Sequence, residues 1–258
     1  MSAADAFAMT HETMTKAALV DEAPFWIEVN GNRIASWSCS PERLEALAVG
    51  WLRAEGFIVR AEDLVSIEPI ADATGSFGVR ASVDPARATE AERHRRARDE
   101  SGIGALYYVE HAPELLHGEA RTLPLPSPDA VAALFRDLLT SEEAGRDSGA
   151  VYAAALTDGQ TLRHRVEDVG RHNALDKAIG AALLAGEDLG RMGLVLSARV
   201  SSEIALKAAR CGVAWIAGRS IPTTLALRIA AAAGLPIVAC ASGKDARVYW
   251  PPGMEPAP

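Results

Sequence analysis

The last third of the chain constrains the fold most, because three short, uniformly apolar runs alternate there with two longer segments. The apolar runs lie at about 193–198, 213–217 and 235–240, and the segments at about 201–211 and 222–233 have the length and composition of helices. Strands without polar positions are buried on both faces, and helical crossovers between them make neighbouring strands parallel. The sequence therefore predicts an α/β protein whose core is a locally parallel sheet.

Hydroxyl and cationic side chains follow each predicted strand. In an open α/β sheet such residues gather along one edge, where ligands bind. Two of these segments also open a helix, whose unpaired N–H groups favour an anion. We therefore predict a phosphate-binding edge made of Ser197, Arg199, Ser201 and Ser202, of Arg219, Ser220 and Thr223, and of Ala239, Cys240, Ala241, Ser242, Gly243 and Lys244. The alternative is that serines such as Ser202 and Ser220 only cap helices.

A second polar segment, at 166–177, places acids, cations, an imidazole and an amide just before another predicted helix. Functional residues concentrate in such loops, so Arg171 and His172 are predicted to line the same crevice. Asn173 is placed to cap the helix that follows. A lone histidine is more often a structural residue with its hydrogen bonds satisfied, and this is the alternative for His172.

The first half of the chain is predicted to begin with strands. Alternating apolar and polar residues at 25–37 flank Asn30-Gly31, a dipeptide that suits a type I′ hairpin turn. A helix is then predicted to open at Ser40-Pro41 and to stop at Gly56, and further strands are predicted over 64–83.

A charge run at 86–100 predicts a solvated helix or loop, and it leads into an exposed glycine loop at 101–104. Alternate prolines at 124, 126 and 128 indicate a linker before a helix over 129–139. We therefore expect a flexible tail over 1–20, a β-rich N-terminal lobe over 21–125 and an α/β cofactor-binding lobe over 126–258.

The net charge of −8 is unevenly distributed: residues 1–150 hold 14 Lys and Arg against 25 Asp and Glu, whereas residues 151–258 hold 12 against 9. An acidic chain binds an anion at a local basic site, which argues against wrapping nucleic acid. No run approaches the ~18 apolar residues that span a bilayer. The first twenty residues contain Asp5, His11, Glu12 and Lys16 where a signal peptide would need an unbroken apolar stretch. We expect a cytoplasmic protein. Three scattered cysteines, Cys39, Cys211 and Cys240, suggest neither a disulfide framework nor a zinc site.

Four segments in order resemble the FdhD family of formate dehydrogenase accessory proteins. The run EDVGRHNALDKAIG at 167–180 is very similar to the family signature, and residues 29–56, 199–213 and 219–234 resemble its other segments. The resemblance implies a three-layer sandwich of the cytidine deaminase-like kind and a homodimer. It also implies binding of the molybdenum bis-molybdopterin guanine dinucleotide cofactor, or its tungsten analogue. Sulfur would come from a cysteine desulfurase, and the client would be the catalytic subunit of formate dehydrogenase.

The chain departs from the family pattern at the glycine loop. Sulfur-transferring members usually carry cysteines where this chain has Ile103 and Leu106, and neither side chain can form a persulfide. Lys244 stands where an arginine is usual, and Tyr152 replaces a histidine. We therefore predict that the protein binds and delivers the cofactor without carrying sulfur to it, while the glycine loop acts as a lid.

Three other functions stay open at the level of sequence. The first is a sulfur carrier that uses Cys240, or Cys211, in place of the loop cysteines. The second is a deaminase-like enzyme, suggested only by fold analogy, although the chain lacks the zinc pattern of such enzymes, in which an H-x-E is combined with a P-C-x-x-C. The third is a structural subunit of the dehydrogenase complex.

Overall fold

The computed structural model describes residues 20–71, 76–116, 121–140, 151–240, 246–249 and 251–253. The predicted tail over 1–20 and the stretch Ala241 to Lys244 of the predicted phosphate edge lie outside these residues, apart from residue 20. None of the described helices is both long and apolar enough to span a bilayer.

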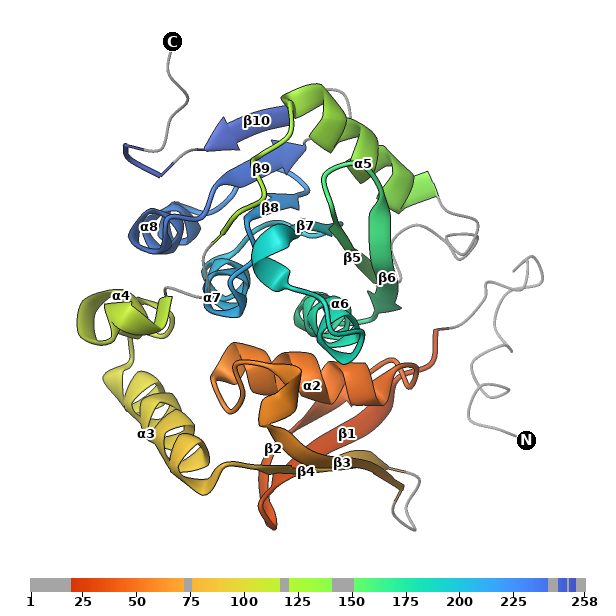
Figure 1. Ribbon diagram of the computed structural model, residues 1–258, viewed down its shortest axis with the longest axis vertical. Coiled ribbons are helices and arrows are strands. Elements are labelled where there is room, and N and C mark those ends of the chain that lie inside the picture. The colour runs from red at the N-terminus through yellow and green to blue at the C-terminus, as the bar shows by residue number, and fades with distance from the viewer. Residues whose placement is uncertain are drawn as a thin grey trace, which may run out of the picture.

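The N-terminal part forms a four-stranded sheet in the order β2-β1-β4-β3 (Figure 1). Its strands are β1 (Ala23–Val29), β2 (Asn32–Cys39), β3 (Leu64–Ala71) and β4 (Phe77–Val83). Strands β1 and β2 are antiparallel and are joined by Asn30 and Gly31, both with positive φ (47° and 85°). The predicted hairpin and its turn are therefore confirmed, as are the strands over 64–83.

Helix α2 (Leu44–Glu55) begins later than predicted. Ser40 does not open it, because its backbone N–H donates to Asp168 and its hydroxyl accepts from the N–H of Val169. The chain then passes through Arg43 in the left-handed region (φ 54°) before the helix starts. Gly56, also left-handed, ends the helix as predicted.

The charge run forms helix α3 (Pro85–Ser101), capped by the Asp84 side chain, and Gly102 ends it in the left-handed region. The glycine loop follows, then a short helix, α4 (Leu106–His111), and the 3₁₀ turn η2 (Pro113–Leu116). Two further 3₁₀ turns are η1 (Ala61–Asp63) and η4 (Leu189–Arg191). Helix α4 was not predicted, since it is only one and a half turns long.

The C-terminal part contains a six-stranded mixed sheet in the order β10-β9-β8-β7-β5-β6. Strands β7 (Gly193–Leu196), β8 (Trp215–Gly218) and β9 (Ile237–Cys240) are parallel, which confirms the prediction from the apolar runs. The other strands are β5 (Tyr152–Thr157), β6 (Leu162–Asp168) and β10 (Ala246–Tyr249). Strands β6 and β10 form the two edges of the sheet and were not predicted, because both are largely polar.

Helices cover both faces of this sheet (Figure 1). Helices α6 (Arg171–Leu184), α7 (Ser202–Cys211) and α8 (Thr224–Ala233) pack on one face, and α5 (Pro128–Thr140) packs on the other. The α/β class is therefore confirmed. The narrower assignment to the cytidine deaminase-like kind, and the domain boundary at 125/126, stay predictions.

Helix α2 packs directly on α6 and brings the two parts of the chain into one shared core. The contact is close because glycines lie at the crossing. A Cβ at Gly50 would collide with the backbone of Asp176, and one at Gly180 would collide with the backbone of Ala46. A side chain at either position would force the two helices apart.

Candidate functional site

The exits of the parallel strands form a cavity of about 550 Å³, which we call the phosphate cavity. Its wall has polar and apolar parts. It contains the predicted residues from two strand exits and from the start of α6, together with Tyr152 and Ala198: Tyr152, Arg171, Ser197, Ala198, Arg199, Ser201, Arg219, Ser220 and Thr223. Its volume lies within the usual range for small-molecule sites.

The register of the sheet explains why these residues meet. Leu196 of β7 lies opposite Gly218 of β8, and Gly218 lies opposite Ala239 of β9, so the three strands end side by side. The loops that follow are tied together as well. The N–H of Arg219 donates to the carbonyl of Ala198 (2.9 Å), which holds the first two exits together.

Three arginines give the phosphate cavity its positive charge. Arg171, Arg199 and Arg219 are all exposed, and none of them forms an ion pair with another described residue. Arg199 donates a long hydrogen bond from Nε to the Ser220 hydroxyl (3.4 Å). Guanidinium groups without carboxylate partners are available to an anionic ligand, and their planar geometry fits phosphate and carboxylate oxygens.

Two helix N-termini add to this field. Neither Gly170 before α6 nor Ser201 before α7 caps its helix with a side chain. The Ser201 hydroxyl is buried and has no hydrogen-bond partner among the described residues. A buried hydroxyl without a partner is unfavourable unless a ligand or water satisfies it. These features fit a phosphate bound at the start of α7.

Simple helix capping, the alternative proposed for Ser202 and Ser220, occurs instead at Thr223. Helix α8 is capped by Thr223, whose hydroxyl accepts from the N–H of Ala226 (3.1 Å). Ser220 lies outside the helix with φ 66°, a conformation that is strained for a residue with a side chain. Strain of this kind is typical of ligand-binding loops.

His172 lies beside the phosphate cavity but does not line it. Burial, with the charges of Lys207 and Arg171, lowers the pKa of its imidazole to about 4, so the ring is neutral near pH 7. Its Nε2 atom is buried and has no hydrogen-bond partner in the described part of the chain. Ser202 likewise falls outside the cavity wall, as the first residue of α7.

Asp168, Asn173 and Lys177, which lie in the family-signature segment at 167–180, hold the structure together and do not line the phosphate cavity. Asp168 accepts hydrogen bonds from the N–H of Gly170 (2.8 Å) and from Asn173 Nδ2 (2.9 Å), and it pairs with Lys177 Nζ (2.7 Å). Asn173 therefore orients Asp168 and does not cap α6, which corrects the prediction made for it. The same network holds Ser40, so the segment at 166–177 joins the N-terminal sheet to α6.

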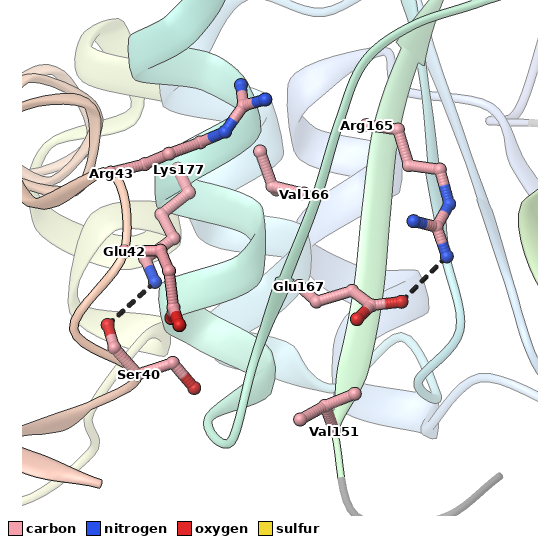
Figure 2. Close-up of a pocket in the computed structure, with 8 residues that line it drawn as sticks. All are labelled: Ser40, Glu42, Arg43, Val151, Arg165, Val166, Glu167 and Lys177. Atoms are coloured by element: carbon pink, nitrogen blue, oxygen red, sulfur yellow. Dashed lines mark hydrogen bonds and ion pairs between the residues drawn. The ribbon is translucent and has the colours of Figure 1, made fainter. Parts of the chain in front are cut away.

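A second cavity, of about 440 Å³, lies beside this network, and Figure 2 shows its residues. Lys177 donates to the Ser40 carbonyl (2.9 Å), and Arg165 on β6 pairs with Glu167 (2.7 Å). Lys177 and Arg165 thus have carboxylate partners, Asp168 and Glu167. The three arginines of the phosphate cavity have none among the described residues, and we therefore regard this cavity as the functional site.

The glycine loop lies next to the phosphate cavity. A Cβ at Gly104 would lie 3.6 Å from Glu203 Oε1, in the first turn of α7. Ile103 is exposed at the tip of the loop and Leu106 begins α4. The two residues in the family's cysteine positions are thus close to the helix that Ser201 precedes. The lid role stays a prediction.

All three cysteines are buried. Burial is the main cause that raises the pKa of Cys39 to about 12 and those of Cys211 and Cys240 to about 11. Cys240 has no exposed surface and packs under α5, on the face of the sheet opposite α7. Ala239 is buried too, so neither of these predicted residues lines the cavity. Within the described ranges, no His, Cys, Asp or Glu side chains form a group of three that could hold a metal ion.

Two residues of the cavity wall were not predicted as site residues. Ala198 lies between Ser197 and Arg199, and only its backbone position identifies it. Tyr152 was noted as a departure from the family pattern and lies at the start of β5, next to β7. Its position at the start of an apolar strand could have indicated a site residue. The antiparallel pairing of β5 with β7, which brings Tyr152 to the cavity, could not be deduced from the sequence.

The chain is similar to known proteins along most of its length. The sequence profile of the FdhD/NarQ family matches residues 20–254. A "Sulfur carrier protein FdhD" from Staphylococcus haemolyticus is 34% identical over 84% of this chain and 81% of its own length. One of the same name from Bacillus subtilis is 31% identical over 91% of this chain and 88% of its own length.

A solved structure shows the same arrangement. It is the crystal structure of a formate dehydrogenase accessory protein from Desulfotalea psychrophila, which is 27% identical and has a TM-score of 0.67. The match covers 90% of this chain and 88% of the other. The similarity therefore extends over almost the full length of both chains.

Proposed function

Because this chain belongs to the FdhD/NarQ family, we propose that it binds the guanine-dinucleotide form of the molybdenum cofactor and assists its insertion into formate dehydrogenase. The observation that carries the proposal is the phosphate cavity. Three arginines without ion-pair partners among the described residues surround it, at the N-terminus of α7. The named accessory role of the solved relative supports formate dehydrogenase as the client.

The chemistry of the cavity fits one pyrophosphate of the cofactor. Arg171, Arg199 and Arg219 would hold the phosphate oxygens, and the Ser201 hydroxyl, which has no hydrogen-bond partner among the described residues, would donate to the ligand. The neutral His172 adds no positive charge, and its buried Nε2 stays close to the site. The cofactor supplies the metal and the pterin chemistry, while the protein binds and orients it.

The cofactor carries two guanine nucleotides, and each chain has one phosphate cavity at its parallel strand exits. A symmetric homodimer would present two such sites to the two halves of the ligand. We therefore propose a homodimer as the working unit. Light scattering at micromolar concentration that shows a monomer would count against this part of the proposal.

Sulfur transfer is the second candidate function, because curated relatives carry the name of a sulfur carrier. A carrier needs an accessible thiolate that accepts sulfur from a desulfurase persulfide and passes it on. Ile103 and Leu106 occupy the loop positions, and burial raises the pKa of every cysteine thiol in this chain. We therefore propose that this protein handles the cofactor without carrying sulfur.

The binding part is tested with GDP, which has the nucleotide and pyrophosphate of one half of the cofactor. GDP should bind to the native protein and raise its melting temperature. Arg199→Ala and Arg219→Ala should each weaken GDP binding about tenfold or more, because a charge-assisted hydrogen bond contributes roughly 1.5–3 kcal/mol. Arg228→Ala is the matched control, since Arg228 is an exposed arginine of α8 that lies outside the cavity. Equal GDP binding by all four proteins would exclude this site.

The sulfur part is tested by mass. The protein is incubated with a cysteine desulfurase and cysteine, and its intact mass is then measured. We expect no added sulfur atom. An added sulfur that disappears in Cys240→Ser, together with loss of formate dehydrogenase activity in cells carrying that variant, would establish the sulfur carrier instead.

A further inference from the structure

A second positively charged cavity lies at the opposite end of α7 from the phosphate cavity. It has a volume of about 400 Å³ and lies between the end of α2, the start of α3 and η2. Four arginines contribute to its wall, and we call it the arginine cavity: Arg53, Arg60, Arg87 and Arg210. The two cavities share no residue. They lie at opposite ends of α7, a helix of 10 residues that rises roughly 1.5 Å per residue.

Arg210 is the most informative of these residues because it is buried, with only 6% of its surface exposed. Its NH1 group donates to the Tyr108 hydroxyl (3.0 Å), and its guanidinium lies 4.5 Å from the centre of the Tyr108 ring. It forms no ion pair with any residue that the structure describes. Glu55, a buried carboxylate whose charge also attracts Arg210, forms its ion pairs with Arg98 and Arg95.

The buried lysines of the same region are paired. Lys177 binds Asp168 (2.7 Å), and Lys207 binds Asp176 (2.6 Å). A buried charge without a countercharge is strongly unfavourable, since the desolvation of the ion is not offset. Arg210 differs from these lysines because it has no direct ion pair among the described residues, although the charge of Glu55 attracts it. It lies in the wall of a cavity large enough for an anion.

Neighbouring residues hold the guanidinium groups in place around this cavity. A Cβ at Gly56 would collide with Arg210, so the glycine that ends α2 leaves the space that this side chain occupies. Arg53 donates to the backbone carbonyls of Arg210 and Cys211 at the C-terminus of α7, which fixes its orientation. Arg87 approaches Asp63 only to 4.0 Å.

The acidic residues of the wall do not balance this charge. Glu90 and Glu114 are its only carboxylates among the described lining residues, against four arginines. His94 also lies in the wall, and burial is the main cause that lowers the pKa of its imidazole, so it adds no charge near pH 7. The wall therefore carries more cationic than anionic side chains, while Asp63 and Glu55 attract some of its arginines from outside it. The site is partly desolvated, and Coulomb attraction is strong in such a place.

We propose that the arginine cavity is a binding site for a small polyvalent oxyanion, either a phosphate ester or a polycarboxylate. The guanidinium groups of Arg210 and Arg87 bind the oxyanion from two sides, and Arg210 gains a direct ion pair. The bound anion links α3 to α2 and α7, the elements that carry these arginines. This site is separate from the phosphate cavity and does not depend on the function proposed above.

The test uses the full-length protein in a chloride buffer and NMR of the arginine Nε–Hε groups. Pyrophosphate and citrate are the two probes, and the Arg210 signal is assigned by its loss in Arg210→Lys. We expect the Arg210 signal to shift on addition of at least one probe, and the probe that acts more strongly identifies the chemistry of the ligand. Arg87→Gln should weaken this response about tenfold, which corresponds to roughly 1.4 kcal/mol.

Two control variants make the result specific to this cavity. Arg199→Ala, in the phosphate cavity, and Arg228→Gln, on the exposed side of α8, should leave the response of the Arg210 signal unchanged. Arg87 is not buried, so its replacement reports on binding even if a change at Arg210 prevents folding. An Arg210 signal that does not move with either probe at millimolar concentration would overturn the proposal. So would an equal response in Arg87→Gln and in the parent protein.

Discussion

Removal of the Asp168 carboxylate should destabilise the protein more than any other single change at the junction of its two sheets. Asp168 is fully buried and has four partners: Lys177, the N–H groups of Ser40 and Gly170, and Asn173 Nδ2. In Asp168→Ala, Lys177 keeps its charge in a site where its side chain is only 1% exposed. The unpaired ammonium group and the three unpaired donors are the source of the effect.

The expected loss is about 3–5 kcal/mol, which is the usual result of breaking a buried ion pair from one side. Lys177→Met should be milder, at roughly 1–3 kcal/mol, because Asp168 would keep its three N–H donors. The double variant Asp168→Ala/Lys177→Met removes both charges at once. It should therefore be less destabilised than the sum of its single changes predicts, since the coupling energy of contacting charges is not additive.

Urea denaturation followed by circular dichroism measures these free energies of unfolding. Glu167→Gln is the matched control, because Glu167 is the preceding residue of β6 and its ion pair with Arg165 is partly exposed. Such a pair contributes about 0–1 kcal/mol. A loss below about 1 kcal/mol for Asp168→Ala, or strict additivity in the double-mutant cycle, would refute the role given to this network.

Three further predictions concern pH, packing and thiols. Because the pKa of His172 falls from 6.5 to about 4 on folding, the protein loses stability as the pH falls from 6.5 to 4. His172→Gln should lose less free energy of unfolding between pH 7 and pH 4.5, as measured by urea denaturation. Equal losses in the variant and the parent would exclude this cause. Gly180→Ala should cost about 1–3 kcal/mol or more, because its Cβ would meet the α2 backbone; an unchanged melting temperature would contradict the close crossing. The three buried thiols should react with Ellman's reagent only on unfolding; rapid labelling of the native protein would show an accessible cysteine.

Apolar periodicity was sufficient to predict the parallel part of the C-terminal sheet. Strands β7, β8 and β9 are buried on both faces, so their sequences are uniformly apolar. The edge strand β6 carries exposed and half-buried charges and has no such pattern. We predicted that α2 starts early because serine often caps a helix. In the structure Ser40 instead binds Asp168, which lies 128 positions away in the sequence. Such long-range contacts leave no local signal.

The candidate site was predictable for a similar reason. Residues that follow parallel strands meet at one edge, so Arg199, Arg219 and their hydroxyl neighbours could be grouped from the sequence. The arginine cavity could not be deduced in this way. Arg53 donates a hydrogen bond to the carbonyl of Arg210, which lies 157 positions away in the sequence. The two residues are on different helices whose packing depends on the whole fold.

The most direct test of the proposed function is elemental and mass analysis of the protein purified from cells that make the molybdenum cofactor. We predict that the purified protein contains molybdenum together with the phosphorus of two pyrophosphates per metal atom. The double variant Arg199→Ala/Arg219→Ala should contain neither, while Arg228→Ala should match the parent. A parent protein that carries no cofactor but gains a persulfide sulfur in the same cells would contradict the proposal and establish a sulfur carrier.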